Sequence, residues 1–161
     1  EMGDGRWEMG DGRWEMGDGR KFWHKRYNKM VKRFEDLLAW QKSRELVKLI
    51  YLLTKQDYIS RDFGLANQLQ RAAVSMMTNI AEGFERTHLK EKIQFYNVAR
   101  ASGGEIRSLI YVVRDIYPEL KENCDKISTE LDNTGKLISG LIKSTEARIN
   151  PPNSNLLTPN S

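Results

Sequence analysis

The sequence predicts an all-α protein, an antiparallel up-down four-helix bundle. In four successive segments apolar residues recur every three or four positions, which is the period of a helix with one buried face. Short polar loops separate these segments, and none alternates apolar and polar residues as a half-buried strand does. Helices of roughly 20 to 28 residues joined by short loops pack antiparallel against their neighbours, so a bundle is expected.

The first helix is predicted over about 35–54 and the second over about 65–82. The apolar stripe of the first contains Trp40, Ser43, Val47, Ile50 and Thr54, widened by Leu46 and Leu53. The stripe of the second contains Leu65, Leu69, Ala72, Ala73, Met76, Ile80 and Phe84. Asp62 suits the N-cap of the second helix, and Gly83 suits a left-handed residue at its end.

The third helix is predicted over about 88–116, with Thr87 as its N-cap. Pro118 should end this helix and open the fourth, because proline is tolerated in a first turn and hinders the helix before it. The fourth helix steps four and three residues through Leu120, Cys124, Ile127, Leu131, Thr134, Ile138 and Leu141. This is a heptad pattern of the kind that packs along a seam.

Two glycines, Gly103 and Gly104, lie in the middle of the third predicted helix. Each costs about 1 kcal/mol of helix stability relative to alanine, so their presence calls for a reason. The small Ala72-Ala73 pair of the second helix is the natural partner for a close approach. A hinge or a notch for a ligand is the alternative.

The chain opens with three copies of one heptapeptide, Glu-Met-Gly-Asp-Gly-Arg-Trp, the last ending in Lys21. The seven-base unit GAGATGG, read through all three frames, encodes this peptide, so residues 1–29 are interpreted as translated upstream DNA and expected to be disordered. Met30 is then the expected start, 30–149 the bundle, and 150–161 a disordered tail. A genuine glycine-rich arm is the alternative for the repeat.

Bulk properties limit the classes of function. The whole chain carries a net charge of +4, and residues 30–161 keep 19 basic against 16 acidic side chains, which permits nucleic-acid contact without requiring it. Cys124 is the single cysteine, so no intrachain disulfide can form. No export signal and no bilayer-spanning run is evident, and a cytoplasmic location is expected.

No residue pattern indicates catalysis, a cofactor or a metal. Glu85 and His88 have the Glu-x-x-His spacing of di-iron bundles, but such sites need two copies and further glutamates. Glu82 and Glu105 lie near apolar stripes and could meet in the bundle. Arg71, Asn79 or a capping amide is the expected partner of either, because a buried carboxylate needs one. We therefore expect a protein that is not an enzyme.

Basic residues suggest an anionic partner. Arg100, Arg107 and Arg114 step by seven and share one helical face, and Lys42 and Arg44 lie on the first helix. These five are the candidate nucleic-acid-binding residues, and a merely solvated face is the alternative. The first helix also carries a second apolar set, Leu38, Leu49 and Leu52, which predicts a closed homo-oligomer.

Four segments resemble the family of four-helix-bundle proteins encoded in 23S ribosomal RNA intervening sequences. They read Phe-Glu-Asp-Leu-Leu-Ala-Trp-Gln at 34–41, Arg-Ala-Ala-Val-Ser at 71–75, Asn-Ile-Ala-Glu-Gly at 79–83 and Ala-Arg-Ala-Ser-Gly-Gly-Glu at 99–105. The motif residues for which the resemblance implies a structural role are Trp40, Arg71, Ser75, Asn79, Glu82, Gly83 and Glu105. The sequence departs from the family at Met76-Met77, which should straighten the second helix.

The resemblance implies an antiparallel four-helix protomer, assembly as a homopentamer and no enzymatic activity. The chain is also similar to the accessory protein of diversity-generating retroelements, which implies a basic surface that engages a reverse transcriptase and nucleic acid. We expect a non-catalytic, oligomeric binding module for RNA, DNA or a nucleic-acid enzyme. The alternative is a structural or protein-interaction bundle, and the genomic neighbourhood would distinguish the two.

Overall fold

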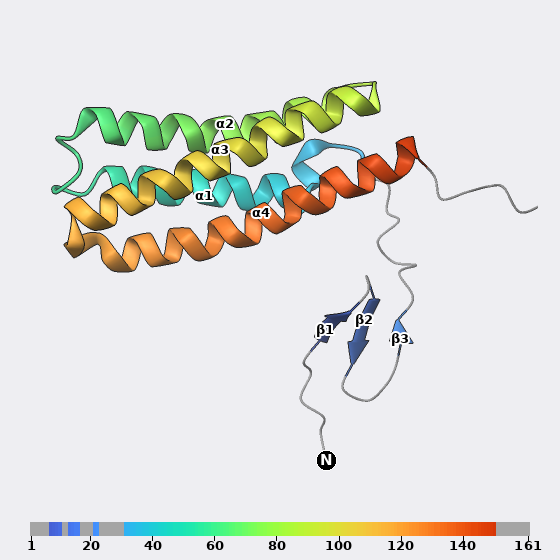
Figure 1. The fold of residues 1–161 in the computed structure, drawn as a ribbon, viewed down its shortest axis with the longest axis horizontal. Helices are drawn as coiled ribbons and strands as arrows, with labels where there is room; N and C mark the ends of the chain where they lie inside the picture. The colour runs from blue at the N-terminus through green and yellow to red at the C-terminus, as the bar shows by residue number, and fades with distance from the viewer. Residues whose placement is uncertain (1–6, 11–12, 17–20, 23–30, 151–161) are drawn as a thin grey trace, which may run out of the picture. The chain divides into compact units, whose positions relative to one another are not determined.

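Each of the four amphipathic segments becomes one long helix that buries its apolar face against the others. The structure is a computed structural model that describes residues 7–10, 13–16, 21–22 and 31–150. Its long helices are α1 (Leu38–Thr54), α2 (Phe63–Glu85), α3 (Leu89–Ile116) and α4 (Lys121–Ile149). Each packs on the next along the chain and α4 packs on α1, so the predicted antiparallel up-down bundle is confirmed (Figure 1).

The core runs through the centre of the bundle and takes its side chains from the predicted stripes. Leu46 and Ile50 of α1, Met76 of α2 and Ile106 of α3 are almost fully buried within it. On α1 the buried face is rotated slightly from the prediction, because Ala39 is buried while Trp40 is only half-buried at the edge. The periodicity therefore predicts the face correctly to within one residue.

The seam of α4 follows the predicted heptad only as far as Ile138. After that the buried residues are Ile142 and Thr145, and Leu141 is half-buried. A straight helix has 3.6 residues per turn and drifts about 20° per heptad from a strict seven-residue repeat. Over three heptads this drift moves the seam by one residue.

The helix ends follow the predictions at Asp62 and Pro118 and depart from them at Thr87. Asp62 is the N-cap of α2, as predicted: the Leu65 backbone N–H donates to its Oδ1 at 3.2 Å, and the Tyr117 hydroxyl donates to Oδ2 at 3.2 Å. Thr87 is not the cap of α3, because His88 holds that position without a side-chain cap bond. Pro118 opens a short 3-10 helix, η2 (Pro118–Leu120), which leads into α4.

The conspicuous glycines mark close contacts between helices. A Cβ on Gly103 would lie 2.8 Å from the Met76 Cε atom, so α2 does approach there, through a methionine side chain rather than the Ala72-Ala73 pair. Gly104 has open space around it. Gly83 does not end α2, which continues to Glu85. The Tyr96 ring packs directly on Gly83 and fills the space that a Cβ atom at this position would occupy.

A second unit, Glu1–Lys32, contains three short strands: β1 (Trp7–Gly10), β2 (Arg13–Met16) and β3 (Lys21–Phe22). They pair antiparallel in the order β1-β2-β3, with Trp7 opposite Met16. Disorder was expected for residues 1–29; the structure describes these three short strands there, and the rest of 1–29 and residues 151–161 lie outside the described residues. The tandem copies place Trp7 and Trp14 on neighbouring strands.

Candidate functional site

The face shared by α3 and α4 carries the predicted arginine row. The Arg107 guanidinium donates to Asp132 Oδ1 at 2.7 Å, and the Arg114 guanidinium donates to Asp125 Oδ1 at 2.6 Å. The two arginines and the two aspartates each step by seven residues, in opposite directions along antiparallel helices. Two members of the predicted row, Arg107 and Arg114, are therefore paired with carboxylates of α4.

Asp125 lies between two cations. Lys121 donates to its second carboxylate oxygen, Oδ2, at 3.0 Å. The hydrogen bond from Lys121 has the largest effect and lowers the pKa of Asp125. Burial opposes it, and the charges of Lys121 and Arg114 lower the pKa further. The carboxylate is therefore held in its charged form, and this end of the α3–α4 face is close to neutral.

Arg100 differs from the other two arginines. Arg107 pairs with Asp132 and Arg114 with Asp125, and the same register places Arg100 opposite Ser139. Lys136 and Lys143 lie about one turn before and after Ser139 along α4. All three cations are exposed, and none makes an ion pair with another described residue. The free positive charge of this face is therefore concentrated at one end of it.

The same end of the bundle holds two further cations. Lys92 donates from Nζ to the carbonyl oxygens of Gly83 and Phe84 in the last turn of α2, where the helix dipole favours a positive charge. Burial lowers the pKa of Lys92, and the positive charge of Arg148 lowers it further. Glu85 acts in the opposite direction. We call Arg100, Lys136, Lys143 and Arg148 the α3–α4 basic end; Glu146 lies on the same side of α4.

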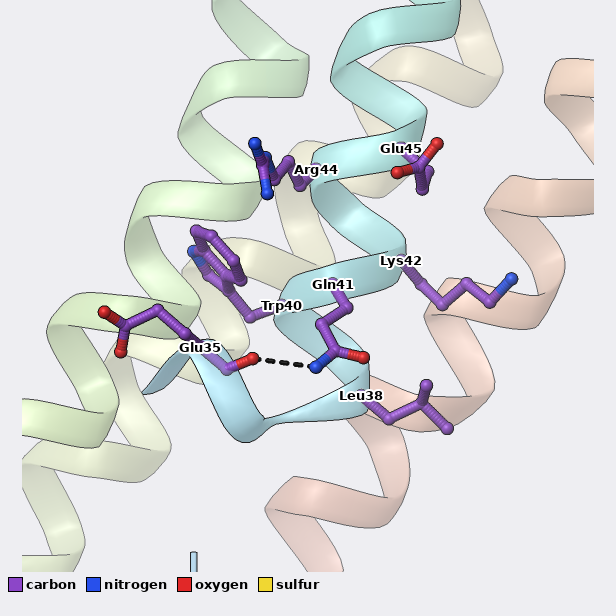
Figure 2. A pocket seen from close by; sticks show the side chains of 7 residues that line it. All are labelled: Glu35, Leu38, Trp40, Gln41, Lys42, Arg44 and Glu45. Atoms are coloured by element: carbon purple, nitrogen blue, oxygen red, sulfur yellow. Dashed lines mark hydrogen bonds between the residues drawn. The ribbon is translucent and has the colours of Figure 1, made fainter. Parts of the chain in front are cut away.

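The two predicted cations of α1 do not join this surface. Lys42 reaches toward α4, with Nζ 3.9 Å from Glu130 Oε2, whereas Arg44 lies on the other side of α1 (Figure 2). The Arg44 guanidinium carbon is 5.8 Å from the centroid of the Trp40 ring, a cation–π contact. Both line a shallow surface pocket at the start of α1, which also includes Glu35 and Glu45. The mixed charges there do not favour an anionic ligand.

Several motif residues hold the bundle together. Trp40 packs edge-on against Phe34 of the 3-10 helix η1 (Phe34–Asp36), with ring centroids 5.1 Å apart. Ser75 of α2 is hydrogen-bonded to Ser102 of α3, Oγ to Oγ at 2.9 Å, and Asn79 donates from Nδ2 to the Ser75 carbonyl at 2.8 Å. These contacts fix how α2 lies on α3.

The acidic motif residues do not meet inside the bundle. Glu82 is exposed and forms an ion pair with Arg86 one turn along α2, so neither Arg71 nor Asn79 is its partner. Glu105 is exposed on α3 and lines a second shallow pocket with Arg71, Ser75 and Phe63. Because both carboxylates are solvated, they need no buried partner.

Comparison with known proteins identifies the family. The model of the 23S rRNA-intervening sequence proteins matches residues 35–140, about two thirds of the chain. The chain belongs to this family. A search of curated proteins found no match. Among solved structures, the crystal structure of a protein of unknown function from the S23 ribosomal protein family of Bacteroides thetaiotaomicron is similar, with a TM-score of 0.60 and 20% identity over 66% of this chain and 99% of that one.

The part of the chain matched by the intervening-sequence family contains every motif residue and the whole arginine row. It excludes Lys143 and Arg148, which complete the α3–α4 basic end. These two cations and Lys136 were missed by sequence reasoning because the fourth helix alone shows them mixed with acids. One feature of the sequence could have indicated them: the seven-residue step from Asp125 to Asp132 continues to Ser139, which is not acidic, so the step leaves Arg100 without an aspartate.

The described residues of this family member show neither a metal-binding cluster nor a reactive cysteine. Among the residues that the structure covers, no three His, Cys, Asp or Glu side chains lie close enough to hold a metal ion. The Cys124 thiol is buried, and burial raises its pKa, which disfavours the nucleophilic thiolate. None of the described helices is long and apolar enough to cross a membrane.

Proposed function

We propose that this intervening-sequence protein is a non-catalytic, oligomeric module that binds the phosphate backbone of RNA or DNA through the α3–α4 basic end. The observation that carries the proposal is the contrast along one face. Arg107 and Arg114 are paired with aspartates, whereas Arg100, Lys136 and Lys143 make no ion pair with a described residue. Unpaired cations can release counterions from a nucleic acid on binding.

The geometry favours backbone binding over sequence readout. Lys136 and Lys143 are seven residues apart, about 10 Å along α4, and Arg100 stands between them from the neighbouring helix. Exposed lysines and arginines contact phosphates as mobile point charges, and such contacts position a protein without reading base identity. We expect affinity that depends strongly on salt and weakly on sequence.

The family name supports ribosomal RNA as the first nucleic acid to test. The resemblance to the accessory protein of diversity-generating retroelements adds a reverse transcriptase as a candidate partner and a homopentamer as the candidate assembly. An oligomer would repeat the basic end by symmetry and sum its phosphate contacts.

The proposal is tested by two variants that change the net charge equally. The first replaces Arg100, Lys136 and Lys143 with Gln; the second replaces the paired cations Arg107, Arg114 and Lys121 with Gln. Binding of a structured RNA hairpin and of duplex DNA is measured over a range of salt concentrations. We expect the first variant to bind more weakly and to show a flatter salt slope, by about 0.9 for each duplex phosphate that is no longer neutralised.

The second variant should retain more of both affinity and slope, because its cations are engaged by aspartates. Equal decreases in the two variants would show that only net charge matters and would contradict an assigned site. If the parent protein binds neither nucleic acid at low salt, the alternative of a structural or protein-interaction bundle is favoured. That alternative draws its support from the exposed apolar side chains on α1, α2 and α3.

A further inference from the structure

The first of two exposed surfaces lies along the outside of α1. Its residues follow one another at helical spacing and all are exposed: Leu38, Gln41, Glu45, Lys48 and Leu52. We call this stripe the α1 face. Leu38 and Leu52, at its ends, are 53% and 51% exposed, and Glu45 and Lys48 lie between them. The stripe therefore offers an apolar contact at each end and an acid and a base between them.

The second surface lies over the shallow pocket between α2 and α3. Arg71 of α2 and Glu105 of α3 line its middle. Phe63 lines the pocket and is 79% exposed. On α3, Val98 and Val112 are exposed seven residues to either side of Glu105, and Ile116 is exposed one turn beyond Val112. We call this surface the α2–α3 groove. Like the α1 face, it has apolar ends and one acid with one base in the middle.

The two surfaces are of similar length. Leu38 and Leu52 are 14 residues apart on α1, about 21 Å, and the apolar ends of the groove on α3, Val98 and Ile116, are 18 residues apart, about 27 Å. The charged residues at the centre also correspond. Glu45 precedes Lys48 by three residues, about 4.5 Å along the axis.

The spacing of Arg71 and Glu105 follows from the way α2 lies on α3. Met76 packs at Gly103 and Asp62 is bonded to Tyr117, so residues whose numbers sum to about 179 stand level with each other. Arg71 is therefore level with position 108, three residues and about 4.5 Å from Glu105. The groove thus presents a base and an acid at the same offset as the acid and base of the α1 face.

We propose that the α1 face of one copy of this chain docks in the α2–α3 groove of a second copy. With the incoming α1 parallel to α2 of the groove, Glu45 meets Arg71 and Lys48 meets Glu105. Leu38 then reaches Phe63 and Ile116, and Leu52 reaches Val98. None of the four charged side chains makes an ion pair with a described residue of its own chain, so all four are available.

The arrangement of the surfaces determines the kind of assembly. The α1 face and the groove lie on different sides of the bundle, since α1 packs on α2 and α4 and not closely on α3. Each copy therefore offers both surfaces at once, and the contact is heterologous, which closes into a ring when the rotation allows. The inference rests on the oligomeric part of the proposed function and assigns its interface.

Charge reversal in the full-length protein tests the interface. Glu45→Arg and Arg71→Glu each place like charges together, and we expect either change alone to weaken self-association at least tenfold in sedimentation equilibrium. The two changes in one chain restore opposite charges, and association should return. A one-to-one mixture of the two single variants should also associate, because each supplies the surface that the other needs.

Glu122→Arg and Lys126→Glu, at exposed positions of α4, which contributes to neither surface, are the matched controls and should leave association unchanged. Circular dichroism establishes that each variant keeps its helix content. If the parent assembles and the reversals have no effect, or the double variant fails to recover, this interface is refuted while the proposed oligomer stands. A parent that is monomeric at tens of micromolar refutes both, and nucleic-acid binding is measured separately.

Discussion

The effect of substituting a single residue in this protein depends on what packs against it rather than on its type. Gly83 lies inside a helix, although its sequence context predicts a helix end. A glycine is needed there because the Tyr96 ring occupies the space of a side chain. Gly140 is also helical, and nothing lies near its missing Cβ. The two glycines therefore respond oppositely to the same substitution.

Gly83→Ala should destabilise the protein by about 1–3 kcal/mol, the usual range for overpacking a core. The added Cβ would lie 2.6 Å from Tyr96 Cε1 and 3.0 Å from Phe95 Cβ, so the third helix must shift. Gly140→Ala is the matched control and should stabilise by about 0.5–1 kcal/mol, because alanine is the better helix former. Urea unfolding measures both, and a neutral Gly83→Ala would show that α2 and α3 pack more loosely than these distances indicate.

Tyr96 should make stability decrease in alkaline solution. Burial raises the pKa of its hydroxyl to about 12, while that of the unfolded chain stays near 10. Between these values the unfolded state loses its proton first, so stability that is complete below pH 10 falls as pH rises, by at most about 2–3 kcal/mol. Unfolding of the parent and of Tyr96→Phe is compared at pH 8, 10 and 11. Parallel pH profiles would contradict the assignment.

Pairs of helices determine what the charged residues can do. On α3 alone the arginine row reads as one basic face, and only the antiparallel register with α4 shows that two of its members face Asp125 and Asp132. Exposed ion pairs of this kind contribute about 0–1 kcal/mol, so their main effect is on the surface charge rather than on stability.

Removing the two aspartates should therefore extend the binding surface. In a variant with Asp125→Asn and Asp132→Asn, Arg107 and Arg114 become free. If the proposed function holds, RNA and DNA should bind more tightly, with a salt slope steeper by up to about 0.9 for each further duplex phosphate that is neutralised. Glu119→Gln and Glu122→Gln together give the same charge change at exposed positions elsewhere and serve as control. An equal increase in the control would attribute the effect to net charge alone.

At the scale of the molecule, the bundle contains its own core. Within residues 31–150, every buried hydrophobic side chain belongs to Ala39 or a later position, and the chain divides into compact units at Lys32. A protein of residues 30–161 should therefore have the melting temperature and the mass in light scattering of the full chain. A decrease of several degrees would mean that the preceding segment stabilises the bundle.

The sequence by itself determined the number, order and buried faces of the helices. This information is local: the period of the apolar residues in each segment predicts its face, and residues such as Asp62 mark its start. The remaining errors are displacements of one residue along a helix. His88 takes the cap expected at Thr87, and the seam of α4 passes from Leu141 to Ile142 because the helix does not follow a strict heptad.

Only the tertiary structure decided which charges are free and which surfaces face outward together. Arg107 and Asp132 are 25 residues apart, and no property of either segment alone indicates that they pair. The same holds for Arg71 and Glu105, which come from different helices and line one groove. Helix formation depends on neighbours three and four positions away, whereas a site on a bundle depends on the register between helices, which the packing of side chains such as Met76 and Tyr96 fixes.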